Sequence, residues 1–252
     1  MSKRPIIIGN WKMNRTVSEA IRLITELKSV LSGKQEVEVV VAPSFVALHP
    51  AEIAAQGTPI QIAAQDVFYE ESGPYTGEIS APMLVDAGVK YVIVGHSERR
   101  QHFGETDASV NRKVKASLDN ELMPVLCIGE TKEQREQKKT FDVVERQLRE
   151  CLRGVNDSYA EDIVVAYEPV WAIGTGIPAT PAMAQEVHRF INEKLAVIFR
   201  KDLAEKMRVI YGGSVTPQNI KELMAQPDIN GALVGGASLE ARTFAEIVNY
   251  GE

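Results

Sequence analysis

This chain of 252 residues has few of the features that mark secreted or nucleic-acid-binding proteins. It contains two cysteines, Cys127 in an expected strand and Cys151 in an expected helix, which are too few for a disulfide framework. Lysine and arginine number 28 against 34 acidic residues, a formal net charge of −6, and no long basic run occurs. Because nucleic-acid phosphates require a basic face, we expect no nucleic-acid partner.

Long apolar segments are also missing. No apolar run approaches the ~20 residues that a helix needs to cross a bilayer, so we expect no membrane partner. The first residues do not resemble a signal peptide, because the apolar run Ile6-Ile-Ile8 ends at once with glycine and asparagine. We expect a cytoplasmic protein. Since no linker or low-complexity stretch divides the chain, we also expect one domain over residues 1–252.

Short unbroken apolar runs are what the chain does contain, and they recur along its whole length. Continuous rather than alternating apolarity is typical of strands covered on both faces, as in parallel sheets. The eight runs lie at residues 6–8, 39–41, 60–64, 91–94, 125–128, 163–166, 209–211 and 232–234. Helical patterns separate them: Thr16-Val-Ser-Glu19 forms a capping box, and Thr180-Pro181 and Thr216-Pro217 each place a hydroxyl before a proline suited to the first helical position.

Eight strand-then-helix units in a chain of ~250 residues predict a closed parallel (β/α)8 barrel. An open, doubly wound sheet is the alternative, because the number of strands does not show that the sheet closes. In both folds the functional residues belong at the carboxyl ends of the strands, where this sequence turns polar or rich in glycine.

One carboxylate, Glu168, follows the expected strand at 163–166 and directly precedes Pro169. The residue before a proline is held away from the right-handed helical region, so the backbone at Glu168 is constrained. The eight residues after Glu168-Pro169 are uncharged and mostly apolar or glycine. This pattern indicates an acid or base beneath a flap that excludes water, and an ordinary acidic residue at a strand tip is the alternative reading.

Paired glycines follow the last two expected strands, at Gly212-Gly-Ser214 and Gly235-Gly236. Barrels commonly bind phosphate after these strands, because glycines let backbone N–H groups approach an anion. Lys12, at the end of the first strand, would supply a full positive charge. We interpret these residues as a phosphate site, although paired glycines also occur in ordinary turns.

His96 stands at the start of the expected helix after the fourth strand. The positive potential of a helix N-terminus disfavours imidazolium, so we expect a neutral ring at pH 7 that can donate a hydrogen bond to a carbonyl oxygen. The alternative is a structural histidine, which is how we interpret His49, His102 and His188.

No metal or cofactor is expected. His96 and His102 lack the spacing of metal ligands, and the chain has no cysteine cluster. Gly174-Thr-Gly-Ile-Pro-Ala179 fits the dinucleotide-binding pattern G-x-G-x-x-A, but the segment from Glu168 to Ile173 separates it from the strand that it should follow directly.

The connection from residue 65 to residue 80 is unusually long and shows neither helical nor strand periodicity. Such loops are uncommon and are usually functional or lie at interfaces. Its aromatic residues Phe68, Tyr69 and Tyr75 would be costly to leave in water. They therefore pack against either a partner subunit or their own barrel.

Five motifs together resemble the triosephosphate isomerase family, from the first strand to the last. They are Gly9-Asn-Trp-Lys-Met-Asn14, Gly95-His-Ser-Glu-Arg-Arg100, Ala166-Tyr-Glu-Pro-Val-Trp-Ala-Ile-Gly-Thr-Gly176, Tyr211-Gly-Gly-Ser-Val215 and Val234-Gly-Gly-Ala-Ser238. The resemblance implies an isomerase that interconverts dihydroxyacetone phosphate and D-glyceraldehyde 3-phosphate through an enediol(ate). The pairing of a carboxylate base with a neutral histidine is a known property of that family, and only the resemblance extends it to this chain.

The resemblance also implies residue roles. Glu168 would move the carbon-bound proton, His96 would polarise the carbonyl, and Lys12 and Asn10 would bind the substrate, with Glu98 as the acidic partner near the lysine. Phosphate would be held by Gly174, Ser214, Gly235 and Gly236. Gln65, Thr76 and Arg99 match family positions at the interface of a homodimer, which would form through the 65–80 loop.

Two further points follow from the resemblance. At the far hinge of the flap the family commonly has lysine and a small residue, whereas this chain has Ile177-Pro178-Ala179. Because proline fixes φ, we expect altered loop kinetics with intact chemistry. The alternatives for function are an aldolase that forms a Schiff base on Lys12 and a sugar-phosphate-binding scaffold without activity.

Overall fold

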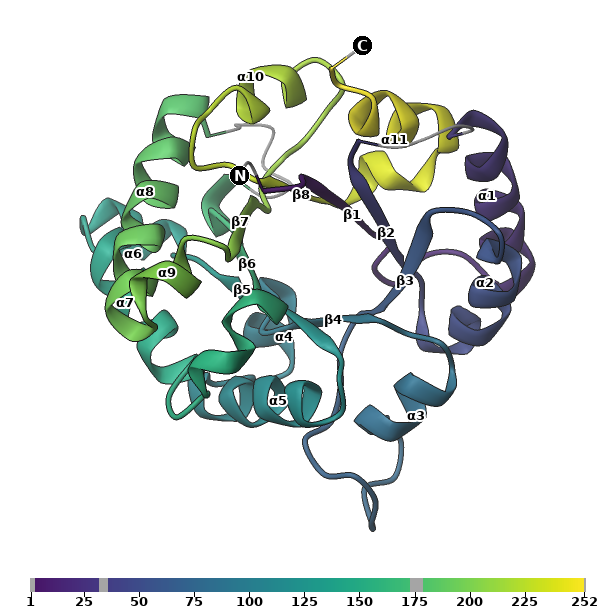
Figure 1. Cartoon of the computed structure of the whole chain (residues 1–252), viewed down its shortest axis with the longest axis horizontal. Helices are drawn as coiled ribbons and strands as arrows, with labels where there is room; N and C mark the ends of the chain where they lie inside the picture. The colour runs from purple at the N-terminus through teal and green to yellow at the C-terminus, as the bar shows by residue number, and fades with distance from the viewer. Residues whose placement is uncertain (1–2, 32–35, 173–178, 252) are drawn as a thin grey trace.

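The computed structural model describes residues 3–31, 36–172 and 179–251. Eight parallel strands close into a barrel, with each strand paired to the next and β1 paired to β8 (Figure 1). The strands are β1 (Ile6–Asn10), β2 (Glu38–Ala42), β3 (Ile60–Ala64), β4 (Tyr91–Val94), β5 (Met123–Ile128), β6 (Val164–Tyr167), β7 (Arg208–Tyr211) and β8 (Gly231–Val234). The expected fold class is confirmed, and the open-sheet alternative is wrong.

Helices surround the barrel on the outside (Figure 1). They are α1 (Val17–Val30), α2 (Leu48–Ala55), α3 (Ala81–Asp86), α4 (Ser97–His102), α5 (Asp107–Asp119), α6 (Lys132–Glu136), α7 (Thr140–Cys151), α8 (Pro181–Ile198), α9 (Lys201–Ala204), α10 (Ile220–Met224) and α11 (Ala241–Val248). Short 3-10 helices occur at η1 (Phe45–Ala47), η2 (Asp157–Asp162), η3 (Val170–Ala172) and η4 (Gly236–Leu239). None of the described helices is long and apolar enough to cross a membrane.

The unbroken apolar runs have a simple origin in the barrel. Successive side chains of a strand point to opposite faces. In β1, Ile6 and Ile8 belong to the core inside the barrel, and Ile7 belongs to the core between strands and helices. All three side chains are fully buried. Because both faces are covered, a polar residue has no solvated position within such a strand and occurs instead at its end.

The helix starts agree with the sequence in two cases out of three. The Thr16 side chain caps α1 and Glu19 completes the capping box, and Thr180 caps α8 with Pro181 in its first turn. Thr216-Pro217 was expected to open a helix, but α10 begins only at Ile220. A turn nevertheless begins at Thr216, whose carbonyl accepts the backbone N–H groups of Asn219 at 3.2 Å and Ile220 at 3.1 Å. The Oδ1 of Asn219 accepts the N–H of Thr216 at 2.9 Å, as in a capping box.

The seams of the barrel are not equal in length. β1 and β2 are aligned over five residue pairs, from Ile6 with Glu38 to Asn10 with Ala42. β7 and β8 are aligned at one pair, Tyr211 with Ala232. The loops that follow β7 and β8 lie directly beyond this short seam, and both contain the paired glycines.

Candidate active site

A cavity of about 330 Å³ lies at the carboxyl ends of the strands and brings most of the predicted site residues together. Its lining includes residues at the ends of β1, β4, β6, β7 and β8, namely Asn10, Lys12, His96, Glu168, Ser214, Gly235 and Gly236. Glu98 is outside this lining but contacts Lys12. Gly174, Ile177 and Pro178 lie outside the described residues.

Asn10 and Lys12 are positioned by the turn at the end of β1. Asn10 is buried, and its Oδ1 accepts the backbone N–H of Lys12 at 3.0 Å. Lys12 has a φ of 53°, which is uncommon for a residue with a side chain. Its Nζ lies 2.6 Å from Oε1 of Glu98. The Nε2 of Gln65 donates to the carbonyl of Lys12 at 2.8 Å. Gln65 therefore supports this turn from within the same chain.

The imidazole of His96 is oriented by the helix that follows it. His96 caps α4, and its Nδ1 accepts the backbone N–H of Glu98 at 3.2 Å. A ring nitrogen that accepts a hydrogen bond carries no hydrogen, so the neutral ring has its hydrogen on Nε2. Nε2 is therefore the atom that can donate to a carbonyl oxygen in the cavity.

Glu168 is buried and faces His96. Its Oε2 accepts the backbone N–H of Ser97 at 2.8 Å. Its Oε1 lies 3.0 Å from Nε2 of His96 but has no well-aligned hydrogen bond among the described residues. One carboxylate oxygen is thus held by the start of α4, and the other is available to accept a proton.

The charges of Glu168 and His96 depend on each other. Burial raises the pKa of Glu168, but His96 and the amide of Ser97 together lower it by more, so the pKa lies below its ordinary value. Burial lowers the pKa of His96, but the carboxylates of Glu168 and Glu98 together raise it by more, so the pKa lies above its ordinary value.

This direction for the pKa of His96 is opposite to the one expected from the helix N-terminus, because the carboxylate of Glu168 lies 3.0 Å from the ring. The hydrogen bond from Glu98 N–H to Nδ1 opposes protonation, since imidazolium has no free lone pair. This contact is made by the backbone at the start of α4, so it is present whatever the position of the Glu168 carboxylate. A neutral His96 stays a prediction.

The glycines after β7 and β8 leave space for different neighbours. A Cβ added at Gly236 would meet no atom within 4 Å among the described residues, so this part of the cavity wall is open to a ligand. A Cβ at Gly212 would lie 2.8 Å from Cγ of Glu168, closer than real contacts allow. Gly212 is therefore needed for the position of Glu168, a role that the interpretation as a phosphate loop did not include.

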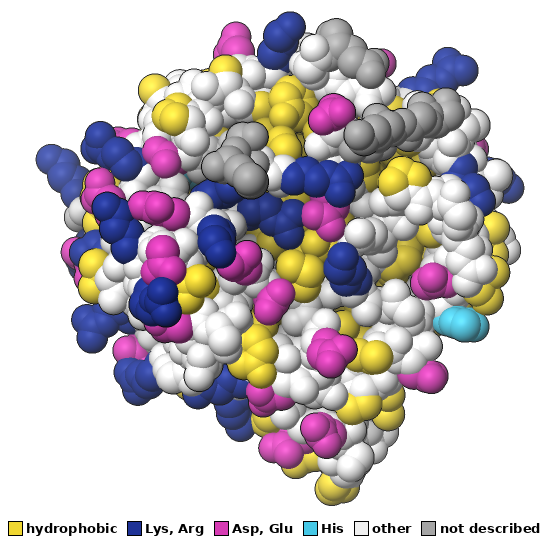
Figure 2. All heavy atoms as spheres, viewed as in Figure 1, with side chains coloured by type: hydrophobic (Ala, Val, Ile, Leu, Met, Phe, Trp, Pro, Cys, Tyr) yellow, Lys and Arg dark blue, Asp and Glu magenta, His cyan; other side chains and the backbone are white. Residues whose placement is uncertain are grey.

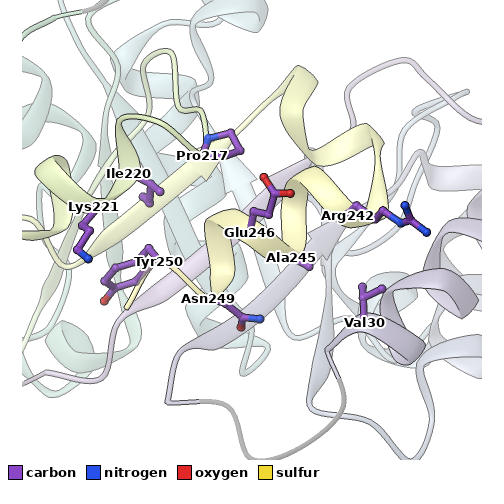
Figure 3. A pocket seen from close by; sticks show the side chains of 9 residues that line it. All are labelled: Val30, Pro217, Ile220, Lys221, Arg242, Ala245, Glu246, Asn249 and Tyr250. Carbon is purple, nitrogen blue, oxygen red and sulfur yellow. The ribbon is translucent and has the colours of Figure 1, made fainter. Parts of the chain in front are cut away.

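A larger cavity, of about 570 Å³, lies outside the barrel, where α10 and α11 approach the end of α1 (Figure 3). Arg242 and Glu246 of α11 and Lys221 of α10 line it. None of the predicted site residues that the structure describes lines this cavity, so size alone does not identify the site.

Comparison with known proteins decides the family. A family model described as triosephosphate isomerase matches residues 5–251. The chain belongs to the triosephosphate isomerase family. The triosephosphate isomerase of Moorella thermoacetica is 57% identical over 98% of this chain and 99% of its own length. That of Citrifermentans bemidjiense is 55% identical over 99% of this chain and 100% of its own length.

A solved structure agrees with these sequences. The crystal structure of triosephosphate isomerase from Bartonella henselae matches with a TM-score of 0.89 and 40% identity, over 98% of both chains. The chain is therefore an enzyme with the reaction of this family, the interconversion of dihydroxyacetone phosphate and D-glyceraldehyde 3-phosphate in glycolysis and gluconeogenesis. The comparisons do not support the aldolase or scaffold alternatives.

Two further residues that the family resemblance assigned to an interface differ in their surroundings. Arg99 is engaged within the chain, with Asp66 at 2.9 Å and Glu105 at 2.7 Å. Thr76 is exposed in the 65–80 loop. Arg99, like Gln65, therefore has a structural role within one subunit.

Proposed function

We propose that Glu168 is the base of the isomerisation and that His96 is the group that polarises the substrate carbonyl. The observation that carries this proposal is the pair itself. A buried carboxylate oxygen without a well-aligned partner among the described residues lies 3.0 Å from the imidazole Nε2, at the wall of a cavity of about 330 Å³. Both side chains line this cavity, which has room for a three-carbon phosphate ester beside them.

The proton transfers follow from these atoms. Oε1 of Glu168 takes a proton from the hydroxyl-bearing carbon of dihydroxyacetone phosphate, and the C–H electron pair becomes the carbon–carbon double bond. The carbonyl oxygen receives the displaced electrons and is stabilised by Nε2–H of His96. His96 then exchanges protons between the two oxygens, and Glu168 returns its proton to the neighbouring carbon, which gives the aldehyde.

Lys12 and Asn10 bind the substrate in this proposal, and Glu98 holds Lys12. The Lys12 ammonium attracts the phosphate and stabilises negative charge on the enediolate oxygens. Ser214, Gly235 and Gly236 hold the phosphate, as does Gly174, which lies outside the described residues. The open space beside Gly236 supports this role.

Glu168→Asp tests the assignment. The shorter side chain withdraws the carboxylate by about one bond length, and a displacement of that size can lower kcat by about 100-fold with little change in KM. Glu161→Asp is the matched control, because Glu161 is an exposed carboxylate paired with Lys206. A coupled assay measures both variants. Equal kcat for Glu168→Asp and wild type contradicts the role of Glu168.

We also infer a homodimer through the 65–80 loop. Figure 1 supports this, because the connection between β3 and α3 extends away from the barrel. Large apolar side chains are exposed in this loop, at Tyr75 (40%), and in other segments, at Met13 (96%), Val46 (75%) and Phe103 (68%). Aromatic side chains are enriched at protein interfaces, so the exposure of Tyr75 in the projecting loop supports this inference. Within the loop, Phe68 contacts Tyr69 and Tyr75 with ring centroids 4.2 and 4.7 Å apart.

Sedimentation of Tyr75→Asp tests the dimer, with Val197→Asp as control, because Val197 is exposed at 82% on α8, outside the loop. We expect Tyr75→Asp to sediment as a monomer and the control to sediment as the wild type does. A wild-type chain that is monomeric at micromolar concentration contradicts the inference.

Three broader assignments complete the proposal. Residues 1–252 form one domain, which is supported by the pairing of β1 with β8 in one barrel. The enzyme is cytoplasmic and has no nucleic-acid partner. The surface supports the second point, since on the face in Figure 2 lysine and arginine side chains are interspersed with aspartate and glutamate. Limited proteolysis, cell fractionation and nucleic-acid retention assays test the three in turn.

A further inference from the structure

The turn that carries His96 is held by an arginine that does not line the cavity. Gly95, between β4 and His96, has a φ of +71°. A Cβ there would lie 3.1 Å from Nη2 of Arg100 and 3.1 Å from the methyl carbons of Val110. The guanidinium of Arg100 therefore occupies the space that the missing side chain of Gly95 leaves beside the turn.

The contacts of Arg100 connect this turn to two other helices. Its Nε donates to the carbonyl oxygen of Gly95 at 2.8 Å. Its Nη1 pairs with Asp107, the first residue of α5, at 2.6 Å, and its Nη2 lies 3.6 Å from Sγ of Cys151 at the end of α7. The Arg100 and Asp107 side chains are each 18% exposed. The three contacts use all three nitrogens of the planar guanidinium, which leaves it little freedom to turn.

The contact on Gly95 acts directly on the backbone of His96. The carbonyl of Gly95 and the N–H of His96 belong to one planar peptide. The hydrogen bond from Arg100 to that carbonyl therefore also fixes the orientation of the His96 N–H. Glycine does not resist rotation of this peptide, because it lacks a Cβ. The same turn aims the His96 ring and presents the Ser97 N–H to Glu168. A small rotation there would misplace both partners of the proposed proton transfer.

We propose that Arg100 is a positioning residue for His96, which it holds in its productive orientation through the Gly95 carbonyl while Asp107 and Cys151 anchor its other nitrogens. The inference rests on the proposed role of His96. Loss of the Arg100 contact should lower kcat and leave phosphate binding unchanged, because the proposed phosphate residues follow β7 and β8, across the closed barrel from β4.

Arg100→Lys is the first test, measured alone and together with His96→Gln. Lysine keeps the charge near Asp107 but cannot reach three partners from one nitrogen. We expect Arg100→Lys to lower kcat roughly 10- to 100-fold, as a displaced catalytic group does, with inhibition by inorganic phosphate changed by less than about twofold. In the His96→Gln background the same substitution should lower kcat by less than about threefold, because residues that act as a unit are not additive.

Arg146→Gln is the matched control. Arg146 also contacts Asp107, at 3.2 Å, but it is 55% exposed and its contact does not involve Gly95. We expect its kcat to stay within about twofold of wild type, as for ordinary surface substitutions. A spectroscopic measurement accompanies the kinetics. In the full chain labelled with ¹⁵N-histidine, the His96 ring signals, identified by their loss in His96→Gln, should shift in Arg100→Lys and not in Arg146→Gln.

The outcomes separate the two proposals. The positioning role is overturned if Arg100→Lys leaves kcat unchanged. It is also overturned if Arg100→Lys lowers kcat by the same factor in the wild-type and His96→Gln backgrounds. An unchanged kcat in His96→Gln overturns the proposed function itself. If Arg100→Lys does not fold, Asp107→Asn replaces it, since it loosens the anchor while keeping an oxygen acceptor. We then expect Asp107→Asn to lower kcat roughly threefold or more in the wild-type background and to leave it unchanged in the His96→Gln background. A decrease in kcat by the same factor in both backgrounds overturns the positioning role.

Discussion

His188 should make the free energy of unfolding fall in mild acid. It lies on α8 and is fully buried. Its Nδ1 is 3.2 Å from the carbonyl oxygen of Asp228, so Nδ1 carries the hydrogen of the neutral ring. Its Nε2 has no hydrogen-bond partner among the described residues. Protonation would place a charge on this buried nitrogen, and burial accordingly lowers the pKa of His188 from 6.5 to about 4.

The sign and size follow from linkage. Because the folded-state pKa is the lower one, the unfolded chain binds the proton first as the pH falls below 6.5, and folding stability is lost from there down to about pH 4. A difference of about 2.5 pKa units corresponds to roughly 3 kcal/mol in full. About 2 kcal/mol of this should be lost between pH 7 and pH 5.

Urea denaturation at a series of pH values, at one protein concentration, measures this loss. His188→Gln removes the titrating group while its amide can still donate to the Asp228 carbonyl. We expect its stability to fall by about 2 kcal/mol less than that of wild type between pH 7 and pH 5. His49→Gln, at an exposed position, should keep the wild-type slope. Equal slopes for wild type and His188→Gln would refute the reasoning.

Four further predictions concern the site and the thiols. Lys12→Met should lower kcat/KM by at least about 100-fold, because the cavity loses the cation that we propose stabilises developing charge, and Lys12→Arg should recover part of that loss in the same coupled assay. Gly212→Ala should lower kcat about tenfold or more with little effect on phosphate inhibition, because its Cβ would lie 2.8 Å from Cγ of Glu168; equal losses in both measurements would argue instead for damage to the phosphate loop. Since the pKa of Glu168 lies below its ordinary 4.5, the proposed base stays ionised down to that pH, and the acid limb of kcat/KM attributable to it should lie below pH 4.5. Burial raises the pKa of the Cys151 thiol to about 12 and raises that of Cys127 well above its ordinary value, so a thiol reagent at pH 8 should label neither until urea unfolds the chain, and rapid labelling of native protein would contradict this.

The fold could be predicted because its signals are local and repeated. Each strand needs apolar residues on both faces, as Ile6 to Ile8 show, and caps such as Thr16 and Thr180 mark helix starts within a few residues. The start of α10 at Ile220 rather than at Pro217 could not be predicted, because residues 217–219 form turns that the cap pattern does not distinguish from a helix.

The composition of the site could be predicted, but not its internal contacts. Polar residues at strand ends must gather at one end of a parallel barrel, which is why Lys12, His96 and Glu168 line one cavity. Nothing in the sequence places Glu168 3.0 Å from His96, a residue far away along the chain, so the direction in which the pKa of His96 moves was missed. The roles of Gly212 and Arg100 depend on similar long-range contacts.

The short seam between β7 and β8 has a consequence for how this enzyme withstands heat. β7 and β8 are aligned at one pair, Tyr211 and Ala232. Fewer hydrogen bonds therefore resist separation of these two strands than of any other neighbouring pair in the barrel. Ser214 follows β7 and Gly235 follows β8, and both line the cavity. A phosphate ester bound by both residues would therefore link the ends of these two strands. We therefore expect the strands of the unliganded barrel to separate first at this seam, and bound substrate to protect the enzyme against thermal inactivation.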